Sequence, residues 1–228
     1  MVKQSKRYRA ASEAVDRSKV YEIREAIELL KGLPAPKFDE TVDVVVRLGI
    51  DPKKSDQLVR GAVSLPKGLG KTVKVVVFAE GDKADAAREA GADEVGSADL
   101  AEKIEGGWMD FDVCIASPDM MRYVGKLGKV LGPQGKMPSP KSGTVTPNVA
   151  DAVTEFKAGK VEFRTDAGGN VHAGLGKRSF SVDDLEANLR AFLDHLGAMR
   201  PAVVKGDFFR KISISTSMGP GAWVQYGA

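Results

Sequence analysis

The stretch GLGKTVKVVVFA, residues 68–79, decides how the middle of the chain folds. Its first five residues suggest a phosphate-binding loop, which needs Gly, four residues and then Gly-Lys-Ser/Thr, so that backbone N–H groups surround the phosphates. The first glycine is missing, because Leu65 stands five positions before Gly70. A phosphate-binding loop also follows a strand and opens a helix, whereas GLGKT precedes the apolar run 73–79. The stretch therefore predicts a turn that leads into a strand buried on both faces.

Alternating helices and strands are expected to follow this turn. From residue 81 the sequence predicts a short helix that ends near Gly91, and then a short strand at Glu94–Gly96. A second helix follows within residues 97–108, and residues 111–117 predict a third strand. Residues 119–132 and 146–160 predict two more helices. This order is typical of a parallel sheet with helices on both faces, a Rossmann-like three-layer α/β domain. No G-x-G-x-x-G follows its first strand, so dinucleotide binding is poorly supported.

The two ends of the chain have a different pattern. Residues 19–33 place apolar side chains on one helical face, and residues 41–50 alternate as a strand with one buried face. Residues 160–176 predict a hairpin that turns at Gly168-Gly169. An amphipathic helix with Ser181 as its N-cap and a closing strand at 207–219 complete the series. The N-terminal end has few strands and alone would leave its valine face exposed to water.

These patterns predict two domains of different class. Residues 1–67 and 160–228 form a discontinuous, split α+β domain, and residues 68–159 form the inserted α/β domain. The three segments carry 14, 11 and 9 Lys and Arg, in chain order, against 10, 14 and 7 Asp and Glu. The ends are therefore basic and the middle is acidic. This asymmetry fits either a polyanionic partner for the ends or ordinary solvated surfaces.

Residues that could support catalysis or hold a metal are few. His172 and His195 occur in no metal-binding spacing, and no Ser, Thr or Cys stands in a nucleophile motif. Cys114 lies in an apolar run, which predicts a buried thiol and a reducing, cytoplasmic environment. No apolar run reaches the ~18 residues of a membrane span, and no signal peptide is recognisable. We expect no catalysis, cofactor, metal or membrane contact; a nucleotide-dependent enzyme that uses the α/β domain is the alternative.

A basic loop stands out within the acidic middle of the chain. Residues 121–148 contain five Lys and Arg and no acidic residue, with prolines that stiffen the loop and glycines that let it turn sharply. Such a loop suits contact with a phosphate backbone, although a purely structural loop has the same composition.

Motifs along the whole chain resemble those of large-subunit ribosomal protein L-one, the family of the mobile stalk beside the tRNA exit site. The most specific motif is GKLGKVLGPQGKMPSPKSGTV, residues 125–145. Other similar motifs occur in order and at matching spacing: RYRA (7–10), the segment KFDETVDVVVRLGI…GLGK (37–71), GWMDFDV (107–113), AGKVEFRTD (158–166), VHAGLGK (171–177) and STSMGP (215–220).

The resemblance implies a protein that is monomeric when free of the cytoplasmic ribosome. It implies binding to stalk ribosomal RNA through the split domain, assistance in the release of deacylated exit-site tRNA, and repression of its own operon messenger. The principal RNA contacts implied are Lys37, Phe38, Thr41, Ser217, Met218 and Gly219. Weaker candidates are Glu40, Arg164, Asp166 and His172, and a secondary RNA or tRNA contact loop holds Lys126, Lys129, Lys136 and Lys141.

The residue types at the implied site fit RNA. Lys37 can meet a phosphate, and the hydroxyls of Thr41 and Ser217 suit the 2′-OH that distinguishes RNA from DNA. Phe38 offers a flat face to a sugar or base, or else belongs to the core. Three positions depart from the family pattern: Ser217 where threonine is usual, Gln134 where arginine is common, and Ser139 where asparagine is usual. The last two lie within the contact loop of the inserted domain.

Overall fold

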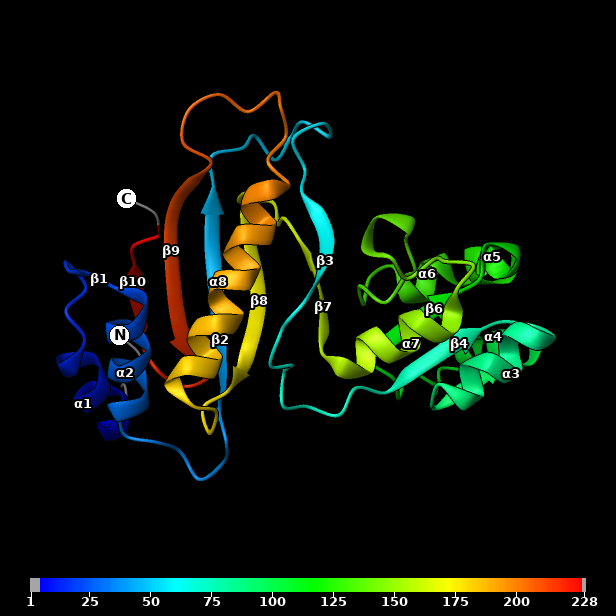
Figure 1. Ribbon diagram of the computed structural model, residues 1–228, viewed down its shortest axis with the longest axis horizontal. Helices are drawn as coiled ribbons and strands as arrows, with labels where there is room; N and C mark the ends of the chain where they lie inside the picture. Colours follow the sequence, from blue (N-terminus) through cyan, green and yellow to red (C-terminus); the bar gives the residue numbers. More distant parts are fainter. Residues whose placement is uncertain (1–4, 227–228) are drawn as a thin grey trace. The chain divides into compact units, whose positions relative to one another are not determined.

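The computed structural model describes residues 5–226, which belong to two compact units (Figure 1). The split unit contains the chain up to Gly70 and from Val161 onward, and the inserted unit contains Lys71–Lys160. The crossings lie three residues and one residue further along the chain than the expected boundaries at 67/68 and 159/160. The predicted fold class, an α+β part with an inserted α/β part, is confirmed.

The split unit is built on a sheet whose strands have the order β1-β10-β9-β2-β8. All neighbouring strands are antiparallel except β1, which runs parallel to β10. The strands are β1 (Val20–Tyr21), β2 (Thr41–Leu48), β8 (Asn170–Lys177), β9 (Phe209–Thr216) and β10 (Gly221–Val224). Because β2 lies between β8 and β9, the N-terminal segment completes its sheet only with the C-terminal one.

Two helices cover one face of this sheet, α2 (Ile23–Gly32) and α8 (Val182–Ala198). The helix α1 (Lys6–Ala14) precedes them. Side chains of α8 are buried at helical spacing, among them Leu185, Leu189 and Phe192. The expected N-cap is confirmed, because the Ser181 hydroxyl accepts the backbone N–H of Asp184 at 3.0 Å.

The opposite face of the sheet is only partly covered. Along β2 the side chains alternate, so that Val42, Val44 and Val46 are buried and the residues between them are half-buried or exposed. We call this second surface the outer face. Its members in β2 and the strands beside it include Thr41, Asp43, Val45, Arg47, His172, Lys177, Lys211, Ser213, Ser215 and Trp223.

The predicted hairpin at 160–176 is wrong in its pairing. The strand β7 (Lys160–Arg164) pairs with β3 (Arg60–Ser64) in a separate ribbon, and β8 joins the main sheet (Figure 1). A single bridge, Thr165–Val171, links the two sides of the turn. The Thr165 N–H instead donates to the Val59 carbonyl at 3.0 Å, which directs the chain toward β3.

The inserted unit has a parallel sheet in the order β5-β4-β6, with helices on both faces. Alternate residues of β4 enter different cores, so the strand is buried on both sides, as its continuous apolar run predicts. The principal elements are β4 (Val75–Phe78), α3 (Asp82–Glu89), β5 (Glu94–Gly96), α4 (Ala98–Glu105), β6 (Val113–Ala116) and α7 (Val149–Ala158).

The predicted helix at 119–132 is interrupted. The chain there forms η1 (Pro118–Met120), α5 (Met121–Val124), η2 (Gly125–Leu127) and α6 (Gly128–Leu131), followed by η3 (Pro140–Ser142). Glycines open two of these segments, and glycine is a poor residue for a helix interior. The broken helix still buries Val124, Leu127 and Leu131 in one core.

The turn GLGK is held by a buried asparagine of α8. Asn188 accepts the Lys67 N–H at 3.0 Å and donates to the carbonyls of Gly68 and Leu175 at 3.0 and 2.7 Å. Gly70 has φ 64°, and a Cβ there would lie 2.6 Å from the Phe180 ring. The glycines therefore serve a tight turn packed on the split unit, and a strand rather than a helix follows them.

Candidate nucleic-acid interface

The start of β2 and the end of β9 form one joined end of the sheet. Val42 pairs with Thr216 in the register of the two strands. One step beyond, the Ser217 N–H donates to the Thr41 carbonyl at 3.0 Å, and the Thr41 N–H donates to the Ser217 hydroxyl at 3.1 Å. The two principal groups of candidate residues, 176 positions apart in sequence, are therefore brought together by backbone pairing.

Two large apolar side chains project into solvent beside this end of the sheet. Phe38 is 55% exposed and Met218 is 51% exposed. The alternative in which Phe38 belongs to the core is wrong. Lys37 is exposed as well. The junction therefore presents an aromatic ring, a thioether and an ammonium group on a backbone fixed by hydrogen bonds.

Glu40 does not belong to the exposed surface. Its side chain is fully buried, where it pairs with Arg178 at 2.8 Å and accepts the Met218 N–H at 2.9 Å. Arg178 also donates to the carbonyls of Lys31 and Leu33. The expectation that Glu40 contacts RNA is therefore wrong in this conformation: the carboxylate positions the 217–219 turn from inside. The alternation of β2 extended back by one step also places this residue inward.

Sequence reasoning missed two arginines that hold the junction. Arg178 directly follows the motif VHAGLGK, and its guanidinium connects three segments of the chain. Arg7, within RYRA, donates to the carbonyls of Met218 at 3.1 Å and Pro34 at 3.2 Å. The motifs marked both positions, but the partners depend on tertiary contacts.

Gly219 closes the turn after Met218. Its N–H donates to the Thr216 carbonyl at 3.0 Å, and a Cβ at this position would lie 2.3 Å from the Thr216 hydroxyl. The close approach that requires glycine is therefore within the protein itself. The Met218 side chain depends on this turn for its direction.

A second cluster lies around the turn between β7 and β8. Arg164, Asp166 and His172 line a hollow of about 570 Å³. Asp166 accepts the N–H groups of Gly168 and Asn170 at 2.8 and 2.7 Å, and its other oxygen is 3.2 Å from His172 Nε2. Slight burial opposes ionisation, but the hydrogen bonds from Asn170, His172 and Gly168 hold the pKa of Asp166 well below its usual range. Asp166 thus organises the turn and orients His172.

Each cluster has a member on the outer face, Thr41 at the junction and His172 in the second cluster. His172 is opposite Val45 of β2, and Lys177 is opposite Thr41, to whose hydroxyl its ammonium donates at 3.2 Å. Val45 lies four positions after Thr41 along β2, which corresponds to about 13 Å. One extended ligand can therefore reach both clusters.

The basic loop of the inserted unit is more ordered than its composition suggests. The Ser139 N–H donates to the Thr144 hydroxyl at 2.8 Å, and this hydroxyl lies 3.0 Å from that of Ser142. Lys136 donates to the carbonyls of Met109 and Phe111 at 3.1 and 2.6 Å, so its ammonium group is bound to the backbone of the inserted unit. Lys136 is therefore removed from the candidate contacts, while the exposed side chains of Lys126, Lys129 and Lys141 remain candidates.

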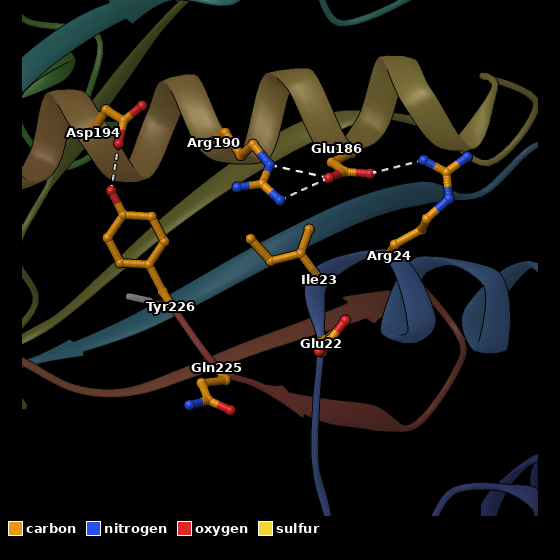
Figure 2. A pocket seen from close by; sticks show the side chains of 8 residues that line it. All are labelled: Glu22, Ile23, Arg24, Glu186, Arg190, Asp194, Gln225 and Tyr226. Carbon is orange, nitrogen blue, oxygen red and sulfur yellow. Dashed lines mark hydrogen bonds and ion pairs between the residues drawn. The ribbon is translucent and has the colours of Figure 1, made fainter. Parts of the chain in front are cut away.

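A hollow of about 670 Å³ on the helical side of the split unit has a different character (Figure 2). Its cations are already neutralised, because Arg24 and Arg190 both pair with Glu186 at 3.3 and 2.8 Å. Tyr226 donates to Asp194, and this hydrogen bond raises the pKa of Tyr226 to about 12 (Figure 2). A polyanion gains little from charges that are paired in this way.

Comparison with known proteins identifies the family of this chain. The sequence profile of the "Ribosomal protein L1p/L10e family" matches residues 29–220. The chain belongs to this family. Proteins named "Large ribosomal subunit protein uL1" are similar over nearly the whole length. That of Bordetella pertussis is 59% identical over 225 residues, 99% of this chain and 97% of the relative. That of Thiobacillus denitrificans is 56% identical over 228 residues (100% and 99%), and that of Kosmotoga olearia is 54% identical over 221 (97% and 96%).

Membership in this family confirms the resemblance seen in the motifs. It also agrees with the expectation of a ribosomal protein rather than an enzyme, and the alternative of a nucleotide-dependent enzyme has no support from the GLGKT turn. Among residues 5–226, no helix is long and apolar enough to cross a membrane.

Proposed function

We propose that the protein is a structural constituent of the cytoplasmic large ribosomal subunit and binds ribosomal RNA of the mobile stalk through the split unit. The observation that carries this proposal is the joined end of β2 and β9, with Phe38 and Met218 exposed on either side of a hydrogen-bonded junction. Exposed side chains on a rigid backbone suit recognition of a structured RNA, because little ordering is needed on binding.

Each side chain has a proposed part in the contact. Phe38 stacks on a base or sugar, and Met218 packs against the same surface of the RNA. Lys37 meets a phosphate. The Thr41 hydroxyl, which already accepts from Lys177, and the Ser217 hydroxyl, which accepts the Thr41 N–H, use their remaining lone pairs to bond to the 2′-OH groups of RNA. His172 and Arg164 extend the contact along the outer face, with Asp166 in an orienting role.

Filter binding to a stalk RNA fragment tests this proposal. Met218→Asp is expected to weaken binding strongly, because it places a carboxylate against phosphates. Val203→Asp is the matched control, since Val203 is 56% exposed in a different loop of the same unit. Phe38→Ala is expected to cost about 1–3 kcal/mol of binding free energy, the range for loss of an aromatic stack, and Leu58→Ala, 44% exposed, is its control.

The binding of wild-type protein decides the main claim. We expect an affinity in the nanomolar range that falls steeply with salt, as for other specific nucleic-acid complexes. Binding no tighter than to random RNA of the same length would reject the proposal. If Met218→Asp and Val203→Asp weaken RNA binding equally while the wild-type protein binds tightly, the protein binds RNA at a site other than the β2–β9 junction.

Two finer roles are proposed on the family resemblance. The protein helps to release deacylated tRNA from the exit site, with Lys126, Lys129 and Lys141 of the inserted unit as contacts. It also represses translation by binding a similar RNA fold in its own operon messenger through the same junction. Direct binding to the messenger leader, weakened by Met218→Asp in parallel with ribosomal RNA, tests the second role. Crosslinking of these lysines to exit-site tRNA tests the first.

A further inference from the structure

A basic groove lies on the outer face at the edge formed by β1, β10 and β9. Arg17, Val20, Arg210, Lys211 and Trp223 line it, and its volume is about 310 Å³. The three cations are exposed, while the indole of Trp223 is half-buried and forms a wall. Lys211 Nζ lies 5.1 Å from the centre of the Trp223 ring, which holds the ammonium at the groove.

A fourth cation lies directly beside the groove. Arg47 is the cross-strand partner of Lys211, and both side chains are exposed on the outer face. Like charges directly opposite each other on a sheet destabilise it. Among residues 5–226, none of these four cations is in an ion pair; Arg17 only donates to the Ser12 hydroxyl at 3.3 Å. Arg24 and Arg190 differ from these four cations, because both of them pair with Glu186 (Figure 2).

We propose that this groove binds the phosphate backbone of RNA and extends the contact of the split unit beyond the two clusters. This inference rests on the proposed function, because it takes its ligand from the junction on the same face. β2 connects the sites: Thr41, Asp43, Val45 and Arg47 point outward in turn, and six residues of strand span about 20 Å. An RNA anchored at Phe38 and Met218 can therefore lie along β2 with a distal strand in the groove.

The chemistry favours phosphates over bases. Lys211 already lies over the ring of Trp223, and Arg17 and Arg210 supply further N–H donors around the same hollow. Unpaired cations gain most from a ligand of high charge density, and their counterions are released when it binds. The indole acts here by positioning Lys211.

The slope of log Kobs against log salt concentration tests this inference on the full-length protein with a stalk RNA fragment. The double variant Arg17→Gln/Lys211→Gln is expected to reduce the magnitude of the slope by about 2, since each lost phosphate contact removes about one unit. Lys54→Gln/Lys205→Gln is the matched control: both lysines are exposed in the split unit, lie outside the groove, and carry the same charge. The conservative pair Arg17→Lys/Lys211→Arg is expected to keep the wild-type slope.

The outcomes separate this inference from the proposed function. Tight wild-type binding with equal slopes for the groove variant and its control overturns the groove and leaves the junction as the RNA site, so that an acidic protein would be the better ligand for the groove. Wild-type binding no tighter than to random RNA overturns both. Unchanged thermal unfolding of the groove variant, expected because its two residues are exposed, excludes misfolding as the cause of a reduced slope.

Discussion

Replacing Arg178 by methionine is expected to lower the free energy of unfolding of the split unit by about 3–5 kcal/mol. The side chain of Glu40 is 0% exposed and that of Arg178 is 12% exposed. The substitution therefore leaves a buried carboxylate with the Met218 N–H as its remaining donor. The carbonyls of Lys31 and Leu33 also lose the hydrogen bonds that they accept from the guanidinium. Methionine retains an apolar side chain of similar length, so the loss is mainly electrostatic.

Thermal unfolding followed by calorimetry measures this effect. For a chain of this size, 1 kcal/mol corresponds to about 2–4 °C, so the transition of the split unit is expected to fall by about 6–20 °C. The inserted unit has hydrophobic cores of its own and serves as an internal reference. RNA binding at the junction is expected to weaken too, because Glu40 holds the Met218 N–H.

Arg190→Met is the matched control for this prediction. Arg190 pairs with Glu186 at 2.8 Å, but its side chain is 58% exposed. Exposed pairs contribute at most about 1 kcal/mol, so its shift is expected to be small. If Arg178→Met shifts the transition no more than Arg190→Met does, the Glu40–Arg178 pair does not hold the junction.

Three further predictions concern other parts of the chain. Gly219→Ala is expected to cost about 1–3 kcal/mol in urea unfolding, because its Cβ would lie 2.3 Å from the Thr216 hydroxyl; Gly32→Ala, with nothing within 4 Å, should cost less. The pKa of Asp166 is lowered on folding, so its contribution to stability is present above the unfolded pKa of about 3.9 and is lost as pH falls through the folded value. The stability difference between wild type and Asp166→Asn should therefore shrink from pH 5 to pH 2, and a constant difference contradicts this. Burial raises the pKa of the Cys114 thiol, so a thiol reagent at pH 8 should react only after unfolding; rapid labelling of native protein contradicts it.

The fold was largely predictable because its strongest patterns are local. The continuous apolar run at β4 and the alternation along β2 report burial on two faces and on one face. The pairing of β7 with β3 was not predictable, because it depends on the Thr165 N–H meeting the Val59 carbonyl. A glycine pair in a turn indicates only that the chain reverses there.

The candidate site was predictable in position but not in the role of each residue. The motifs marked both Glu40 and Lys136, and charge alone suggested surface contacts for them. The structure instead gives each a set of partners within the protein, Arg178 for one and backbone carbonyls for the other. The basic groove was missed because Arg17, Arg47 and Lys211 come together only through the strand order of the sheet.

The hydrogen bonds between Thr41 and Ser217 have a consequence for synthesis of the protein. A polypeptide whose synthesis stops before Ser217 lacks the second half of this junction, because Ser217 follows Thr41 by 176 positions. A nascent chain, or one cut short by premature termination, therefore cannot display the completed surface. Under the proposed repressor role, binding of the messenger at this junction therefore responds to chains that have been translated through Ser217, and not to chains that have only been initiated.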